Sequence, residues 1–196
     1  MGLGFQEVKN VNKPANDIAF RQYISAINDL WQPQSAKDTD TAHRVSELMS
    51  EWLRSTTPDT AWVRNLKAEK SSGFPLYTHP DHGFIQMNHY HAGYRTNTPH
   101  DHGPYWVVYG VYEGEAEIPV YAYDATSNTL RVDRIDRLKG GDTVAYLPGD
   151  IHSTRVPTPE PALVLRFLST DLSQVPRRRF KPEQISEDPV SSPERT

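Results

Sequence analysis

Hydrophobic positions in the first quarter of the chain recur at helical spacing. In NDIAFRQYISAINDLW, residues 16–31, apolar side chains lie three or four positions apart, and in DTAHRVSELMSEWLRS, residues 40–55, they form one stripe. We expect Asn16 and Asp40 to cap these helices, because their short side chains accept hydrogen bonds from the free N–H groups of a first turn. The pattern predicts a pair of amphipathic α-helices packed on the remainder of the fold.

The pattern changes in the Gly- and Pro-rich segment SSGFPLYTHPDHG, residues 71–83. From there on, short runs rich in β-branched and aromatic residues alternate with turns, as in an antiparallel sandwich or barrel. The predicted strands are Gly83–His91, Tyr105–Tyr112, Ala116–Tyr123, Thr129–Ile135, Thr143–Leu147, Ile151–Val156 and Ala162–Leu168. We expect a helical layer over residues 1–75, a barrel over residues 76–176 and, from its polar composition, a flexible tail over residues 177–196.

The amino-acid composition limits the groups that could bind a metal. The 196 residues include no cysteine and eight histidines, so a metal would be held by histidines, carboxylates or both. The net charge of −4 gives no reason to expect a nucleic-acid or membrane partner, and the run Arg177–Arg179 is interpreted as a solvated charge cluster, with anion binding as the alternative. With no membrane-length apolar run and no signal-type start, we expect a cytoplasmic protein that acts on a small molecule.

Two stretches, PHDHGPYW and GDTVAYLPGDIH, contain histidines at informative positions. On extended backbone, residues two apart face the same side, so His100 and His102 can point inward together while Asp101 points away. In the second stretch a tight turn precedes His152, which opens the next predicted strand. Imidazole is a common metal ligand, and three imidazoles can occupy one face of an octahedron. The candidate metal ligands are therefore His100, His102 and His152.

These two stretches resemble the paired motifs of the cupins, in which H-x-H is followed by a glycine after the next strand, here Gly114. The resemblance covers roughly residues 93–168 and implies a mainly β fold, the double-stranded β-helix or jelly-roll barrel, here with the N-terminal pair of helices. Cupins usually carry a glutamate five residues after the second histidine, and this chain has Val107 there. The implied centre holds a divalent metal by three histidines, which leaves its charge for an anionic, chelating substrate and O2.

Within the cupins the arrangement is similar to the thiol dioxygenases, which use Fe(II) to oxidise thiols such as cysteine and 3-mercaptopropionate to sulfinates. The stretch EPALVLRFLS looks like a strand of that family that carries an inward Ser-x-His-x-Tyr triad, and Val164, Arg166 and Leu168 take those three places. His79, which follows Tyr77 and Thr78, takes the place of a carboxylate-binding arginine in the cysteine-specific members. The resemblance therefore implies the class of O2 chemistry and leaves the substrate open.

Arg166 shares a face of its predicted strand with the two triad positions, so we expect it to point into the barrel. An arginine there is costly unless an anion pairs with it, and its planar fork suits a carboxylate. It is interpreted as an anchor for a substrate carboxylate, with an internal salt bridge as the alternative.

Further residues are expected around the same pocket. Tyr109 is the candidate catalytic residue, as a hydrogen-bond donor to bound O2 or substrate, and Tyr77 and His79 are candidates for substrate binding. For His89 and His91 a structural or pocket-lining role is preferred over proton transfer or a second metal site. The predicted pocket-lining residues are His89, His91, Val107, Val164 and Leu168.

The favoured hypothesis is a mononuclear non-heme Fe(II) dioxygenase that converts a thiol carboxylate to a sulfinate. Alternatives are carbon–carbon cleavage of a diketone or enolate, a lyase or isomerase that uses Zn, Ni or Mn as a Lewis acid, and a non-catalytic metal-stabilised binding module. A 2-oxoglutarate oxygenase, suggested by H-x-D at His79–Asp81, explains the other histidines poorly. Pairing into a homodimer is compatible with the sequence.

Overall fold

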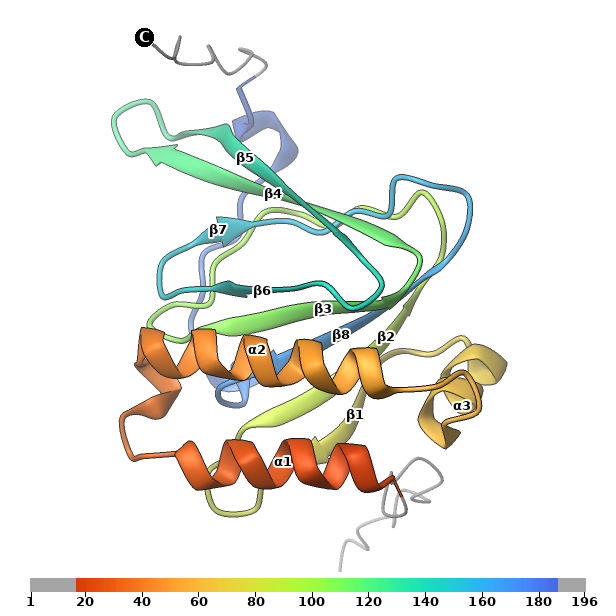
Figure 1. The fold of residues 1–196 in the computed structure, drawn as a ribbon. Coiled ribbons are helices and arrows are strands. Elements are labelled where there is room, and N and C mark those ends of the chain that lie inside the picture. Colours follow the sequence, from red (N-terminus) through yellow and green to blue (C-terminus); the bar gives the residue numbers. More distant parts are fainter. Residues whose placement is uncertain (1–16, 187–196) are drawn as a thin grey trace, which may run out of the picture.

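The computed structural model describes residues 17–186, which form an N-terminal helical layer and two antiparallel sheets (Figure 1). The helices are α1 (Ile18–Leu30), α2 (Thr39–Ser55) and α3 (Ala61–Glu69), with 3-10 turns η1 (Ser35–Lys37), η2 (Leu172–Gln174) and η3 (Pro182–Gln184). No helix in this range is both long and apolar enough to cross a membrane.

The helix starts differ by a few residues from those predicted. Asp17 caps α1 by accepting a hydrogen bond from the Phe20 N–H at 3.1 Å. Asp38, rather than Asp40, caps α2 by accepting one from the Thr41 N–H at 2.8 Å, because the helix begins two residues earlier than the pattern suggested. The other predicted cap, Asn16, lies outside the described residues.

The strands are divided between a larger and a smaller sheet. They are β1 (Ser72–Thr78), β2 (Ile85–His91), β3 (Val107–Glu113), β4 (Glu115–Asp124), β5 (Thr129–Lys139), β6 (Thr143–Tyr146), β7 (Ile151–His152) and β8 (Ala162–Leu168). The larger sheet has the order β1-β2-β8-β3-β6, and the smaller has the order β5-β4-β7. Residues 96–100 continue the smaller sheet beyond β7, through isolated bridges from Thr96 to Arg155 and from His100 to His152.

This crossing pattern is that of a double-stranded β-helix. From β2 to β8 the chain passes repeatedly between the two sheets, so strands distant in sequence become neighbours, as in a jelly roll. The predicted fold class, mainly β with N-terminal helices, is therefore confirmed. The two sheets face each other and remain separate among the described residues, so the expected barrel is a sandwich in form.

Three elements depart from the prediction. The edge strand β1 lies in the segment assigned to a loop, and its register with β2 shifts twice, so it lacks the regular alternation that identifies a strand. The nine-residue α3 has only a short apolar stripe and was not predicted. The strand predicted over 151–156 is regular only at Ile151–His152, although Arg155 still exchanges backbone hydrogen bonds with Glu117 at 2.9 Å.

The two faces of the larger sheet have different partners. Outward-facing Val108 of β3, Phe167 of β8 and Trp106, just before β3, pack in one hydrophobic cluster with the buried sides of α1, α2 and α3. Gly110 on this face lets α2 approach closely, because a Cβ there would lie 2.8 Å from Cδ1 of Leu53. The opposite face of β3 and β8 packs toward the smaller sheet in a second cluster, and the candidate site lies on that side.

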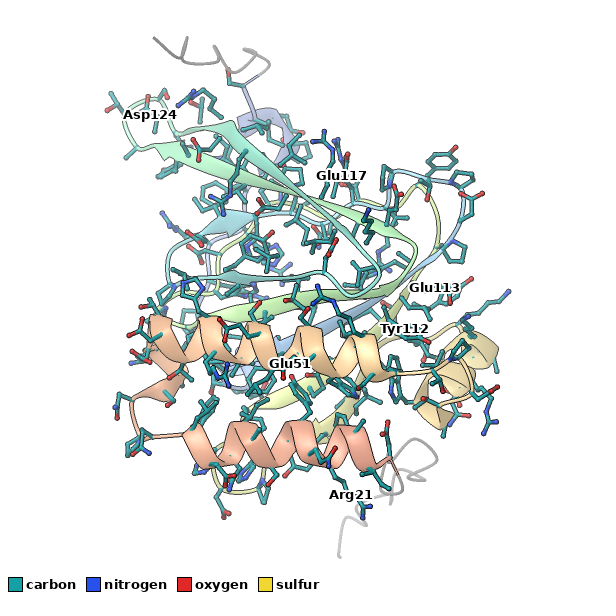
Figure 2. All side chains as sticks on the ribbon, viewed as in Figure 1. Arg21, Glu51, Tyr112, Glu113, Glu117 and Asp124 are labelled. Carbon is teal, nitrogen blue, oxygen red and sulfur yellow. The ribbon has the colours of Figure 1, made fainter. Side chains whose placement is uncertain are left out.

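Charged side chains cover the outside of this arrangement. Figure 2 shows Arg21 of α1 and Glu51 of α2 on the solvent side of the helical layer, and Asp124 at the far end of the β4–β5 hairpin; all three are exposed. Tyr112 instead turns toward α3, where its ring meets that of Trp62 edge-on at 5.4 Å. The polar groups of the candidate site are therefore separated from the helical layer by the larger sheet.

The C-terminal segment continues along the smaller sheet. Phe180 is buried in a cluster with Leu130 and Ile151, and the N–H of Ser186 donates to the carbonyl of Leu130 at 2.7 Å. Residues 177–186, the first half of the tail predicted to be flexible, thus lie against the fold in the structure. Residues 187–196 of that tail lie outside the described residues.

Candidate metal centre

The pairing register brings two of the predicted ligands face to face. The N–H of His100 donates to the carbonyl of His152 at 3.0 Å, and the N–H of His152 donates to the carbonyl of His100 at 3.0 Å. Residues paired in this way on antiparallel backbone have side chains on the same face, only about 5.5 Å apart at Cα. Their ring centroids are 5.1 Å apart, so the sheet register alone joins two stretches that are distant in sequence.

His102 completes the cluster from a position two residues after His100. Its ring centroid lies 5.0 Å from that of His100 and 5.1 Å from that of His152. One ring nitrogen from each of the three histidines lies within 4.8 Å of the others, and all three residues are buried. Within residues 17–186 these histidines are the group of three or more potential ligands that could hold a metal ion.

The hydrogen bonds of the three rings suit a cation. The carbonyl of Thr98 accepts a bond of 2.9 Å from Nδ1–H of His100, which leaves the Nε2 lone pair of that ring free. Both ring nitrogens of His102 and of His152 are buried without a hydrogen-bond partner in the described protein. Each such buried polar atom costs about 1–3 kcal/mol when nothing pairs with it. Imidazole nitrogens in this setting fit a divalent transition metal such as Fe, Zn or Ni.

Burial also keeps the three rings in the form that binds metals. It lowers the pKa of His100 to about 4, with positive Arg166 acting in the same direction. Burial lowers the pKa values of His102 and His152 further, and neighbouring histidines and Arg166 add to the effect. All three imidazoles are therefore neutral near pH 7, and their lone pairs are available to a cation.

A stacked tyrosine supports His152 from the side. The ring of Tyr146 lies 4.2 Å from that of His152 at an interplanar angle of 26°, and its hydroxyl donates to Oδ2 of Asp136 at 3.0 Å. Asp136 is held in turn by Nε of Arg134 at 3.1 Å. These contacts join β5 to β6 across the turn at residues 140–142, so no local pattern in the sequence indicates them.

The position of the expected cupin glutamate is apolar and faces the interior. Val107 is fully buried and lies opposite Tyr146 on β6 and Leu168 on β8. It belongs to the same hydrophobic cluster as Leu168 and Val164. The structure therefore places all three predicted apolar lining residues on the inner face, and no carboxylate belongs to the ligand cluster found among the described residues.

Arg166 lies on the same inner face. It is opposite Tyr109 on β3 and Met87 on β2, and its guanidinium carbon is 5.2 Å from the Tyr109 ring centroid. Its Nε is buried without a hydrogen-bond partner, and no ion pair of Arg166 with a carboxylate is found in residues 17–186. Of the two interpretations of Arg166, the internal salt bridge is therefore not supported, because the guanidinium has no carboxylate partner within the described chain.

Tyr109 links this arginine to the histidines. Its ring meets the ring of His152 edge-on, with centroids 5.4 Å apart, and it packs within 5.6 Å of Tyr146. A ligand that spans from the histidine cluster to Arg166 would therefore pass along Tyr109.

His89 and His91 face the same interior from β2. Their rings stack with centroids 5.4 Å apart, and Nε2 of His89 and Nδ1 of His91 are buried without partners. Burial lowers the pKa of both, to about 4 for His91, with Arg95 and Arg166 contributing. They are not part of the three-histidine cluster, and their placement on the inner face agrees with a pocket-lining role.

Two of the expected substrate-binding residues lie away from the histidine cluster. Tyr77 packs edge-on against Phe20 of α1, and Nε2 of His79 is 3.0 Å from Oδ1 of Asn28 in the same helix. Both residues face the helical layer, because Tyr77 is paired with Gln86, a position of β2 that points away from the inner face. The irregular register of β1 hid this orientation from the sequence pattern.

No protein-family model matches the chain, and no curated protein matches it either. Among solved structures, a cupin-2 domain protein from Shewanella frigidimarina matches with TM-score 0.38 and 18% identity over 49% of this chain and 78% of its own. A double-stranded β-helix protein from Klebsiella pneumoniae matches with TM-score 0.41 and 16% identity over 58% and 93%. The oxalate decarboxylase formate complex of Lactobacillus farciminis matches with TM-score 0.40 and 13% identity over 50% and 27%. The matched structures thus include double-stranded β-helix proteins, and this chain has a three-histidine cluster that could bind a metal.

Replacing His102 with alanine should lower metal affinity by more than about 100-fold, since loss of a direct ligand exceeds the effect of losing a supporting contact. The fold should persist, because the substitution also removes two unpaired buried nitrogens. Metal content after dialysis and the circular dichroism spectrum measure the two effects, with exposed His43→Ala as the control. A stoichiometric metal retained by His102→Ala would contradict the assignment.

Acid should destabilise the metal-free protein partly through His91. Its pKa is about 4 in the folded protein and about 6.5 for an unperturbed histidine, so between these pH values the unfolded chain binds more protons. The free energy of unfolding should therefore decrease as the pH is lowered through this range, with His91 contributing up to about 1.4 kcal/mol per pH unit. Urea unfolding of His91→Gln from pH 6.5 to 4.5 should show a correspondingly smaller slope, with His43→Gln as the control. An unchanged slope in His91→Gln would show that the residue is not buried as described.

Proposed function

We propose that this protein is a mononuclear non-heme Fe(II) dioxygenase that adds O2 to a small, metal-chelating anion. The substrate class we favour is a thiol carboxylate, which becomes a sulfinate. The observation that carries the proposal is a cluster of three buried, neutral imidazoles without a carboxylate, next to an arginine that has no ion-pair partner among the described residues.

The charge of the site supports an anionic substrate. A divalent iron held by His100, His102 and His152 would supply redox chemistry and a Lewis acid, with its charge uncompensated by its ligands. Arg166 adds a further positive charge to the same interior, and low dielectric there strengthens its attraction to an anion. A carboxylate on Arg166 would be held by charge-assisted hydrogen bonds, which fix the orientation of the substrate.

The contacts of three tyrosines single out one candidate donor. The hydroxyl of Tyr146 is used by Asp136, and Tyr77 lies against the helices. Tyr109 remains, between Arg166 and His152. We assign to its hydroxyl the role of donating a hydrogen bond to the substrate or to O2.

The reaction balances without another reductant. A thiol and O2 give a sulfinate and one proton: the S–H bond breaks, two S–O bonds form, and both oxygen atoms enter the product. The sulfur loses four electrons, and O2 accepts four. The chain's residues have to position the thiol and O2 and exclude bulk water, a task that suits the apolar wall formed by Val107, Val164 and Leu168.

That apolar wall also favours a second candidate function. A diketone or enolate chelates a metal through two oxygens and carries no carboxylate, so its body would lie against Val107 and Leu168 and leave Arg166 unused. Carbon–carbon cleavage would then place one atom of O2 in each of two products. A Zn-, Ni- or Mn-dependent lyase or isomerase would use the same histidines without consuming O2.

Oxygen consumption separates these functions. Protein prepared anaerobically and loaded with Fe(II) should consume one O2 per 3-mercaptopropionate and form the sulfinate, and protein loaded with Zn(II) should not. Consumption with acetylacetone alone would favour the diketone reaction. No consumption with either compound at full iron loading would overturn the dioxygenase proposal.

Changing Arg166 to methionine should raise KM for 3-mercaptopropionate by about 100-fold, the scale of a lost charge-assisted hydrogen bond at about 2–3 kcal/mol. The KM for cysteamine, which lacks a carboxylate, should change by less than about threefold. The exposed Arg44→Met serves as the control for loss of an arginine. Equal changes for the two thiols would assign Arg166 a structural role.

A further inference from the structure

The C-terminal segment docks on the loop that carries two of the metal-ligand candidates. Residues Pro176–Phe180, which we call the C-terminal strap, run antiparallel to residues 99–102. The N–H of Asp101 donates to the carbonyl of Arg178 at 3.2 Å, and the N–H of Phe180 donates to the carbonyl of Pro99 at 2.9 Å. The strap follows η2 after β8 and leads to η3 beside β5 (Figure 1).

Close packing fixes the start of the strap. Gly103 has φ +59, a conformation that favours glycine, and a Cβ there would lie 3.1 Å from the carbonyl oxygen of Pro176. At the other end of the strap, Phe180 is buried against the outer face of the smaller sheet. The strap is therefore held at both ends and along its length.

Alternation along the strap directs its three arginines to two different sides. Arg179 is paired with His100 in an antiparallel bridge, so the two residues share a face. Arg178 lies on the other face, where its Nε–H donates to Oδ2 of buried Asp101 at 2.6 Å. Because side chains two residues apart on extended backbone share a face, Arg177 lies with Arg179 on the histidine side.

The charge on that side has no counterpart in the described chain. Asp101 is engaged by Arg178, and no ion pair to Arg177 or Arg179 is found in residues 17–186. Arg177 is partly buried, whereas Arg179 is exposed. Burial and the positive charges of Arg179 and Arg166 lower the pKa of Arg177, in keeping with cations gathered on one side of the site.

We propose that Arg177 is a second anion-binding residue of the three-histidine site, and that the substrate carries two acidic groups besides the group that binds the metal. Arg166 would hold one acidic group from the larger sheet, and Arg177 the other from the strap. This inference deepens the proposed function and rests on its assumption that the histidines form the ligand-binding centre. Arg178 acts only in positioning, since it fixes Asp101 and the strap.

Two thiols that differ by one carboxylate test this proposal. Mercaptosuccinate carries two carboxylates and 3-mercaptopropionate carries one. Binding of each to the Co(II)-loaded protein, kept anaerobic and followed by the thiolate-to-cobalt absorption, needs no turnover. The wild-type protein should bind mercaptosuccinate at least tenfold more tightly than 3-mercaptopropionate.

The variant Arg177→Gln should lose this preference. Its affinity for mercaptosuccinate should fall about 10- to 100-fold, while that for 3-mercaptopropionate, which also reports correct folding, should change less than threefold. Arg177→Lys should keep part of the preference, and the exposed Arg131→Gln on β5 should match the wild type.

Three results would overturn the inference. They are no wild-type preference for mercaptosuccinate, an equal loss of affinity for both thiols in Arg177→Gln, or no thiol-to-metal absorption with either compound. The first two leave the dioxygenase proposal standing, and the third removes the thiol substrate as well. Conversely, a preference that depends on Arg177 in a protein that consumes no O2 would support the inference and reject the oxygenase.

Discussion

Three imidazoles at the centre of the fold lack enough protein partners for their nitrogens, and this constraint organises the site. Hydrogen bonding within the described chain satisfies Nδ1 of His100 but neither nitrogen of His102 or His152. The lone pairs of these rings are therefore available to a cation, and binding one would offset part of the cost of burying them. Burial keeps the three rings neutral, so that they can act as ligands. Because no carboxylate belongs to the cluster, a bound divalent cation would keep its full positive charge.

Strand pairing and alternation in the two sheets position the rest of the site. Reciprocal backbone bonds between His100 and His152 fix the cluster, and alternation along β3 and β8 turns Tyr109 and Arg166 to the same interior. The helices play no direct part at the site, because they cover the opposite face of the larger sheet. The chemistry therefore depends on strand register, and the helical layer supplies hydrophobic burial that keeps the register in place.

The direction of a side chain can be predicted from the sequence where strand alternation or the spacing of a motif is kept. The three histidines, the inward Arg166 and the apolar inner positions were predicted because alternation and motif spacing report directly which way a side chain points. The direction of Tyr77 could not be predicted because two register shifts in β1 break that alternation, and His79, assigned from the resemblance, lies in the turn after β1. For the run Arg177–Arg179 anion binding was only the alternative interpretation, because the sequence cannot separate the directions of three adjacent arginines and only docking against residues 99–102 does so.

The two ligand-bearing segments lie far apart along the polypeptide, since His152 follows His102 by fifty positions. An ion held by both segments would be a cross-link that closes this long loop, and it would stabilise only the state in which the two segments are paired. Ion binding and folding would thus be thermodynamically linked: removal of the ion would also remove a cross-link between residues 100–102 and β7, so chelation and unfolding should promote one another.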